Sequence, residues 1–351
     1  MIVRMRVRPF HHRLKAYVAL TKPRIIELLL ITTVPAMILA ARGWPGLGLV
    51  AGTVAGGSLS AGGANAINNV IDRDIDARMA RTRHRPLPTE SATPREALIL
   101  GIVLAAAGFI TLWVAANIEA AALATGGLGF YVLVYSIYLK RTTPQNIVIG
   151  GAAGAVPALV GWAAVTGGIA LPAWLLFAVI FYWTPPHFWA LALRFRSDYE
   201  AAGVPMLPVV AGERAAAVQI VTYSFVVSGA ALLLQPAAEL GSLYVVSAVT
   251  LGTGFVAASA SLLRSTSAAM RVFRLSNVYL ALLFAAVALD VLIGNTAPAS
   301  QAIAWIGSTL MIGGALTIVA VTRPTAVREL GFVLVPAVGA VVTAVVVLSR
   351  I

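Results

Sequence analysis

The sequence contains no cysteine and few charged residues. In a chain of 351 residues, charged residues make up 11% and acidic residues number 13, whereas 60% of the residues are hydrophobic. Soluble domains carry about 25% charged residues, so this composition argues strongly against a water-soluble protein, and the hydrophobicity argues against a disordered one. Without cysteine there is no disulfide framework, no thiolate-bound zinc and no iron–sulfur cluster.

Long apolar runs dominate what is present. A membrane-spanning helix needs about 20 mostly apolar residues. The N-terminus has basic residues but no early apolar run with a cleavage site, so we expect no removable signal peptide. The fold class is therefore an all-α polytopic membrane protein. Eleven candidate spans are found: Ile25–Ala41, Leu47–Val70, Ala97–Ala116, Ala120–Leu139, Asn146–Val165, Pro172–Leu193, Val218–Leu234, Leu243–Leu263, Val278–Ile293, Ala302–Val321 and Gly331–Leu348.

Basic residues alternate between the two sets of connections. The chain has 25 Lys and Arg residues and a net charge of +12. Only Arg42 and Arg350 fall in one set of connections, and all the others fall in the opposite set. The positive-inside rule then places the N-terminus in the cytoplasm and the C-terminus outside. Basic loops beside anionic lipid account for the charge, so we expect a lipid bilayer and no nucleic acid as partner.

One short acidic cluster follows the second span. Asn68, Asp72 and Asp76 are spaced four residues apart, which places them on one face of a helix, whereas Asp74 points elsewhere. Two carboxylates and an amide suit Mg²⁺, which binds a few carboxylates together with substrate phosphates. The alternative is a solvated helix end with i,i+4 charge pairs.

Basic residues accompany this cluster. Arg81 and Arg85 follow it directly, and Lys140 and Arg141 close the fourth span. A cation site beside arginines is typical of a diphosphate site, because the metal bridges phosphate oxygens and the guanidinium groups bind the rest. The alternative is that these residues serve only to orient the protein in the membrane.

A second cluster lies at the end of the sixth span. The segment Pro185–Trp189 holds His187 behind two prolines, and Arg194 and Asp198 follow. Both clusters belong to even-numbered spans, so both are expected at the cytoplasmic face, where they can meet in one cavity. A proline pair bends a helix and opens space. The alternative for His187 is a hydrogen-bonded structural residue.

These motifs resemble a known family. Asn68-x-x-x-Asp72-x-x-x-Asp76 with Arg81-Thr82 and Arg85–Pro88 resembles the first signature of the UbiA superfamily of intramembrane prenyltransferases. The second signature resembles that of the haem-modifying branch. It consists of Pro185–Trp189, Asp198-Tyr199 and Pro205–Pro208, and Thr21–Arg24 and Tyr138–Thr142 also look like the family.

The resemblance runs from about Ala16 to Ile293 and implies a fold. That fold is a bundle of nine transmembrane helices around a central cavity. We therefore expect a basic cytoplasmic segment at 1–24, an intramembrane prenyltransferase domain at 25–293 and an extension at 294–351 with two further C-terminal transmembrane helices.

The resemblance also implies a reaction. Farnesyl diphosphate ionises with Mg²⁺ as cofactor, and the farnesyl group joins a vinyl group of haem B with addition of water, giving haem O. His187, Asp72 and Asp76 are the expected catalytic residues. The metal would be held by Asn68, Asp72, Asp76 and Asp198, and the diphosphate by Arg81, Arg85, Lys140, Arg141 and Arg194.

The residues alone leave other functions open. A prenyltransferase of the same superfamily could act on an aromatic or quinone precursor, although the Pro185–Trp189 segment argues against it. A secondary transporter would place acids near the bilayer midplane. A non-catalytic assembly factor for a haem–copper oxidase would not need the four-residue carboxylate spacing. We expect a multi-pass protein of the plasma membrane, and a downstream haem-oxidising enzyme is a candidate partner.

Overall fold

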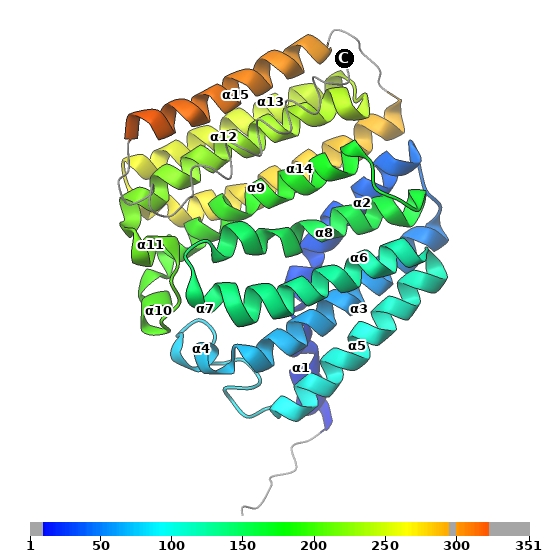
Figure 1. Cartoon of the computed structure of the whole chain (residues 1–351), viewed down its shortest axis with the longest axis vertical. Coiled ribbons are helices and arrows are strands. Elements are labelled where there is room, and N and C mark those ends of the chain that lie inside the picture. The colour runs from blue at the N-terminus through cyan, green and yellow to red at the C-terminus, as the bar shows by residue number, and fades with distance from the viewer. Residues whose placement is uncertain (1–9, 295–299, 323–351) are drawn as a thin grey trace, which may run out of the picture.

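The computed structural model describes residues 10–294 and 300–322, and this part of the chain is almost entirely helical. Its long helices lie side by side with roughly parallel axes (Figure 1). They are α2 (Pro23–Ala41), α3 (Leu47–Ile71), α5 (Pro94–Ala115), α6 (Ile118–Gly129) with the π-helix η1 (Phe130–Leu139), α8 (Asn146–Thr166), α9 (Leu171–Arg194), α12 (Gly212–Ala238), α13 (Ser242–Ala260), α14 (Ala269–Ile293) and α15 (Ser300–Thr322).

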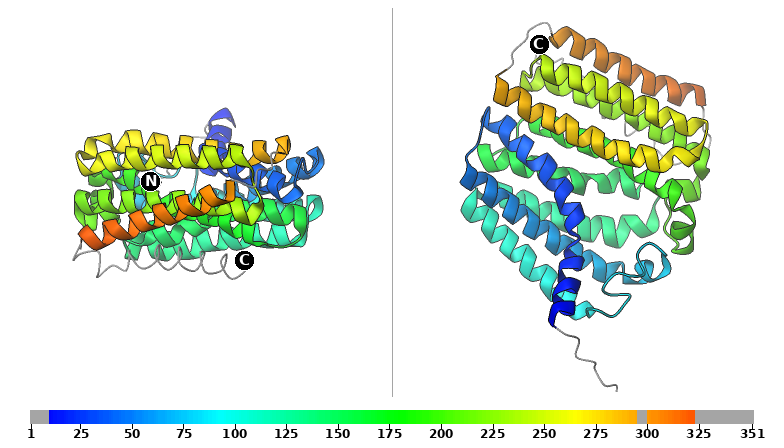
Figure 2. Two further views of the ribbon diagram at one scale, coloured as in Figure 1. Left: turned by 90° about the horizontal axis from the view of Figure 1, so that it is seen from above. Right: turned by 180° about the vertical axis from the view of Figure 1, so that it is seen from behind.

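Short helices gather mainly at one end of this bundle. Figure 1 shows α4, α7, α10 and α11 together where the long helices α3 and α9 finish. Seen from behind, α1 lies across the bundle, where it packs against α3 and α5 (Figure 2). The short helices are α1 (Phe10–Thr21), α4 (Arg73–Arg78), α7 (Lys140–Thr142), α10 (Arg196–Ala201), α11 (Leu207–Val210), η2 (Ser261–Leu263) and η3 (Thr266–Ala268).

The helices coincide with the predicted spans. Eight helices in the described ranges are long and apolar enough to cross a membrane, and α2 and α15 carry the shorter apolar stretches Ile31–Ala41 and Ile303–Ile318. Ten of the predicted spans therefore fall on helices, and the last, Gly331–Leu348, lies outside the described residues. The protein is an all-α, multi-pass membrane protein.

Two helices depart from their predicted form. α14 begins at Ala269, whereas the predicted span begins at Val278. The prediction starts too late because Arg271 and Arg274 lower the hydropathy of the first turns of the helix. The predicted fourth span is an α-helix that continues as the π-helix η1, in which Ser136 Oγ donates to the carbonyl of Tyr131, five residues earlier, at 2.8 Å. Wider π-helical turns are found at functional sites.

Close backbone contact joins α3 to α5. A Cβ added at Gly63 would lie 2.7 Å from the carbonyl oxygen of Gly101, and one added at Gly108 would lie 2.7 Å from the amide nitrogen of Ser60. Small residues let two helices in lipid approach until their backbones touch. Lipid is as apolar as the helix surfaces, so van der Waals packing, and not the hydrophobic effect, stabilises such a contact. This contact fixes α3, which carries the acidic cluster.

The other half of the bundle is centred on α12. Trp189 of α9 and Tyr223 of α12 are fully buried and pack edge to face with ring centroids 5.4 Å apart. On its far side α12 is covered by α15, where Ser308 Oγ donates to the carbonyl of Gly229 at 3.1 Å. The α15 helix therefore shields α12 and lies away from the acidic cluster (Figure 1).

Candidate active site

The predicted row of polar side chains forms at the end of α3. Asp72 ends α3, and α4 starts at the next residue, yet the helical hydrogen bonds continue from Asp72 N to Asn68 O (2.9 Å) and from Asp76 N to Asp72 O (2.8 Å). All three side chains are buried, and Asn68 Nδ2 donates to Asp72 Oδ2 at 2.8 Å. The shared face predicted from the spacing is thus maintained across the junction.

Each carboxylate of the row has its own cation. Lys140 of α7 forms an ion pair with Asp72 Oδ2, and Arg85 Nη1 donates to both carboxylate oxygens of Asp76 at 2.8 Å. Buried carboxylates are stable only when paired or bound to metal, because burial strips them of water. The cations come from two different connections, which therefore converge on the end of α3.

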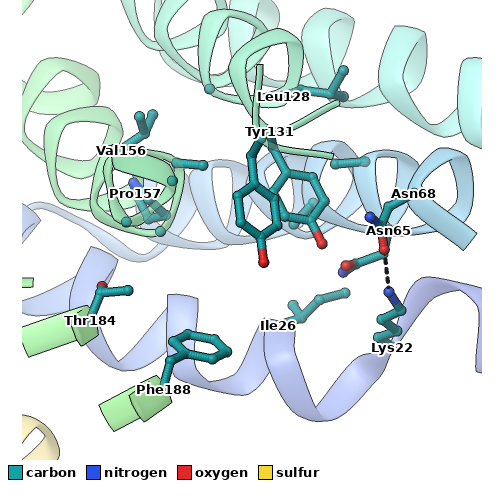
Figure 3. A pocket seen from close by; sticks show the side chains of 18 of the residues that line it. Lys22, Ile26, Asn65, Asn68, Leu128, Tyr131, Val156, Pro157, Thr184 and Phe188 are labelled. Atoms are coloured by element: carbon teal, nitrogen blue, oxygen red, sulfur yellow. Dashed lines mark hydrogen bonds between the residues drawn. The ribbon is translucent and has the colours of Figure 1, made fainter. Parts of the chain in front are cut away.

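A third cation reaches the amide of the row. Lys22, which precedes α2, donates from Nζ to Asn68 Oδ1 at 2.7 Å (dashed line in Figure 3). Burial, together with the positive charges of Arg85 and Lys140, lowers the pKa of Lys22 to about 7. When Lys22 is protonated, three cations surround two carboxylates, and a polyanionic ligand would favour this charged form.

The oxygen atoms of this row fit a hard divalent cation. Asp72 Oδ1 is buried and has no hydrogen-bond partner among the described residues. No three His, Cys, Asp or Glu residues gather as a ready metal site within 10–294 and 300–322. Magnesium commonly takes only one or two carboxylates and completes its shell with water and substrate phosphates. The row therefore fits Mg²⁺ that binds together with a diphosphate.

A cavity of about 350 Å³ opens from this row into the bundle. Its mouth is lined by Lys22, Asn68, Asp72 and their partners, and its interior is lined mainly by small and apolar residues of α3, α6 and α8. Figure 3 shows Tyr131 projecting into the space between Leu128 and Lys22. The size is that of a small-molecule site. One end of the cavity is charged and the remainder is apolar.

Comparison with known proteins identifies the fold family. Residues 29–283 match the UbiA prenyltransferase family. The chain belongs to this family. The row Asn68–Asp76, which resembles the first signature of this family, lines the mouth of the cavity.

Curated relatives in the UbiA family carry a common name. A protoheme IX farnesyltransferase of Thermus thermophilus is 54% identical over 276 residues, which are 78% of this chain and 45% of that protein. The chain thus spans about half the length of this relative. A protoheme IX farnesyltransferase of Frankia alni is 51% identical over 286 residues, covering 80% of this chain and 99% of that protein.

Solved structures agree with the UbiA fold. A structure of digeranylgeranylglyceryl phosphate synthase matches with a TM-score of 0.67 at 18% identity and covers 80% of this chain and 99% of the other. A UbiA homologue from Archaeoglobus fulgidus, bound to DMAPP and Mg²⁺, matches with a TM-score of 0.53 at 17% identity, covering 78% and 99%. At such identities the match shows the fold alone.

Arg81 reaches the cavity, but Asp198 does not line it. The Arg81 guanidinium donates to the Tyr199 hydroxyl at 3.4 Å and lies 5.6 Å from the centre of the Phe195 ring. Asp198, a predicted metal ligand, accepts the backbone N–H of Arg81 through Oδ2 at 3.1 Å. In the structure, therefore, Asp198 anchors the loop that carries Arg81.

Two predicted diphosphate ligands also lie off the cavity wall. Arg141 donates from both terminal nitrogens to Asp74 at 2.8 Å and to the carbonyl of Ile71 at 2.7 Å. These hydrogen bonds hold the pKa of Asp74 well below its usual range. Arg194 is exposed at the end of α9, where it lies 5.6 Å from the Phe195 ring centre.

His187 is packed behind the cavity wall. Its ring lies between Trp183 (centroid distance 4.2 Å) and Phe273 (4.5 Å), and its Nδ1 is 2.8 Å from Ser276 Oγ. Trp183 and Phe188, one on each side of it in the helix, line the cavity themselves. The structure thus brings the second motif to the cavity, with His187 supporting Trp183 from behind.

Sequence reasoning missed several residues of the cavity. Lys22 belongs to a segment that resembles the family, but it was given no role. Tyr131 and Tyr135 stack with ring centroids 5.5 Å apart and line the cavity beside the acidic row. Their four-residue spacing places both on one face, which is the signal that could have found them.

Proposed function

We propose that the protein transfers the farnesyl group of farnesyl diphosphate to a vinyl group of haem B and adds water, giving haem O. The observation that carries this proposal is the buried Asn68–Asp72–Asp76 row, with its cations, at the mouth of an apolar cavity. The choice of substrates is supported by relatives named protoheme IX farnesyltransferase, one of which is matched over 99% of its length.

The donor half of the reaction follows from the charges at the mouth. Breaking the bond between farnesyl C1 and oxygen leaves negative charge on diphosphate. Mg²⁺, when bound by Asn68, Asp72 and Asp76, would neutralise part of that charge. Lys140 and Arg85 pair with these carboxylates in the structure and would be free to bind the phosphate oxygens when the carboxylates hold Mg²⁺. Preorganised cations in a site without bulk water stabilise such a leaving group strongly.

The acceptor half belongs to the α9 side of the cavity. The terminal vinyl carbon of haem B bonds to farnesyl C1, and the cation left on the other vinyl carbon takes hydroxide from water, releasing a proton. Aromatic faces at Trp183 and Phe188 favour nearby cationic carbon. With Nδ1 engaged by Ser276, His187 keeps Nε2 for another partner and fixes the plane of Trp183.

We assign the residues off the cavity wall to positioning. Asp198 holds the backbone of Arg81, and Arg141 ties α7 to α4, which keeps Lys140 beside Asp72. Arg194 is an exposed cation near the mouth and is proposed to attract the anionic donor.

We also propose an orientation. The short helices and the acidic row share one end of the bundle (Figure 1), where nearly all the basic connections fall. This end faces the cytoplasm by the positive-inside rule, in the plasma membrane. The same placement argues against a transporter, whose coupling acids lie near the bilayer midplane. A haem-oxidising enzyme that consumes the product is a candidate partner.

Competition between acceptors tests the proposal. The purified protein is given farnesyl diphosphate, Mg²⁺ and equal amounts of haem B and 4-hydroxybenzoate, and the products are separated and weighed by mass spectrometry. We expect farnesyl and one water to be added to haem B, and no farnesylated benzoate. Transfer to the benzoate alone would replace haem B by an aromatic acceptor and overturn the proposal.

A further inference from the structure

The cavity follows one face of α3 for most of the helix. Thr53, Gly57 and Ala61 are spaced four residues apart and all line the cavity, as does Asp72 at its mouth. An α-helix rises 1.5 Å per residue, so Thr53 lies about 28 Å and Gly57 about 22 Å along the axis from Asp72. The face thus forms a series of levels, each one turn deeper than the last.

Gly57 leaves the cavity open at its level. A Cβ added at Gly57 would meet nothing within 4 Å, whereas one added at its neighbour Gly56 would lie 2.7 Å from Leu112 Cγ. Gly56 is therefore needed for packing against α5, but no helix packing requires a glycine at position 57. The missing side chain provides space inside the cavity.

Thr53 gives the deep end of the cavity a polar group. Its side chain is fully buried, and its hydroxyl finds no hydrogen-bond partner in the part of the chain that the structure describes. Other helical threonines donate to the carbonyl four residues earlier, as Thr111 does to Ala107 at 2.7 Å and Thr125 to Ala121 at 2.8 Å. The Thr53 hydroxyl is left for whatever fills the cavity.

We propose that this face of α3 selects the length of the prenyl chain. The last isoprene unit of a 15-carbon donor lies beside Gly57, and Thr53 forms a polar floor that rejects longer chains. The buried Thr53 hydroxyl has no partner in the described part of the protein, and an apolar chain that reached it would keep water away without offering a hydrogen bond, which is unfavourable. The inference rests on the proposed prenyl transfer, because the diphosphate must be held at Asp72 for depth to measure chain length.

Two substitutions with opposite expected effects test the proposal. Gly57→Leu fills the open level, and Thr53→Val removes the hydroxyl while keeping the shape. Donors of 10, 15 and 20 carbons are compared by kcat/KM for transfer to haem B. Binding of their thiolodiphosphate analogues, which resist ionisation, is measured in parallel. Gly48→Leu is the matched control for the glycine, because Gly48 is an exposed, open position on α3 outside the cavity. Thr111→Val is the control for the threonine.

The proposal predicts shifts in opposite directions. Gly57→Leu should lower kcat/KM and analogue affinity for 15 carbons relative to 10 carbons by about tenfold, because one misplaced methylene in an apolar site costs that much or more. Thr53→Val should raise the 20-carbon to 15-carbon ratio by about tenfold. The controls should keep the profile of the unchanged protein.

The outcomes separate this proposal from the proposed function. Unchanged chain-length ratios in Thr53→Val, or equal losses for all donors in a folded Gly57→Leu, would overturn it. Length-dependent binding that shifts as predicted would support it even if the unchanged protein transferred nothing to haem B, and in that case the proposed acceptor would be wrong. If Gly57→Leu does not fold, Thr53→Val alone decides, since it adds no bulk.

Discussion

At the scale of single residues, the packing of His187 predicts that its removal weakens the use of haem B more than the use of farnesyl diphosphate. His187→Ala removes a ring held between Trp183 and Phe273 together with its contact to Ser276 Oγ, which keeps its own hydrogen bond to the Phe273 carbonyl. Because this side of the cavity is assigned to haem, we expect the KM for haem B to rise by about tenfold, the cost of one lost buried hydrogen bond and its packing. The KM for farnesyl diphosphate should change by less than twofold, as read from initial rates with each substrate varied in turn. Equal changes in both constants would mean a purely structural role.

Asp74 predicts a dependence of stability on pH. Hydrogen bonds from Arg141 lower the pKa of Asp74, so the folded state favours the ionised form. The stabilisation is present at pH 7 and is lost as the pH falls below the ordinary carboxyl pKa of about 4. Asp74 is half exposed, so Asp74→Asn should cost under about 1 kcal/mol at pH 7. In detergent, the difference in melting temperature between the unchanged protein and Asp74→Asn should shrink towards pH 3. A difference that widens on acidification would contradict this.

The residue types of the site could be predicted from the sequence, but their pairing could not. The four-residue spacing of Asp72 is a local signal and fixes a helix face. Its partner Lys140 is 68 residues away, and nothing local distinguishes it from Arg141, which instead binds Asp74. The pairing depends on how the end of η1 turns towards α3, which is a property of the packed bundle.

At the scale of elements, the close contact between α3 and α5 predicts that a larger side chain at Gly63 destabilises the fold. A Cβ at Gly63 would lie 2.7 Å from the carbonyl oxygen of Gly101, and backbone cannot move aside as a flexible side chain can. Gly63→Val should therefore destabilise the fold by about 1–3 kcal/mol or more. Gly48→Val, at an exposed position of the same helix, is the matched control. Thermal unfolding in detergent measures the stability of both variants. Equal melting temperatures would contradict the prediction, because they would mean that α3 and α5 can move apart without loss of stability.

Most spans could be predicted because hydropathy reports directly on burial in lipid. The start of α14 could not, since its first turns carry arginines that lie outside the apolar run. The short helix α10 was also missed, because a helix of 6 residues leaves no periodic pattern, whereas the helical continuation into α4 was expected from the spacing of Asp72 and Asp76. The π-helix η1 has an ordinary apolar sequence with no local signal for wider turns. Its Ser136 bonds both its own helix and Asn68, a residue that lies 68 positions away.

At the scale of the whole molecule, charge and apolar volume are separated. Buried carboxylates and their cations close one end of the bundle, and an apolar cavity continues from them between α3, α6 and α8. A prenyl diphosphate has the same division between a charged head and an apolar tail. The cavity has small residues on its α3 side and aromatic residues on its α9 side, which we propose as separate places for donor and acceptor.

We propose that the protein farnesylates haem through the Asp72 row. The most direct measurement is mass analysis of haem extracted from cells that express the chain, its Asp72→Asn variant or its Glu119→Gln variant. Asp72→Asn removes a charge without adding bulk, and Glu119 is exposed at the start of α6, away from the row. We expect a haem heavier by one farnesyl group and one water from the unchanged chain and from Glu119→Gln, and no such haem from Asp72→Asn at an equal level of protein in the membrane. Unmodified haem B in all three, or the heavier haem in Asp72→Asn as well, would contradict it.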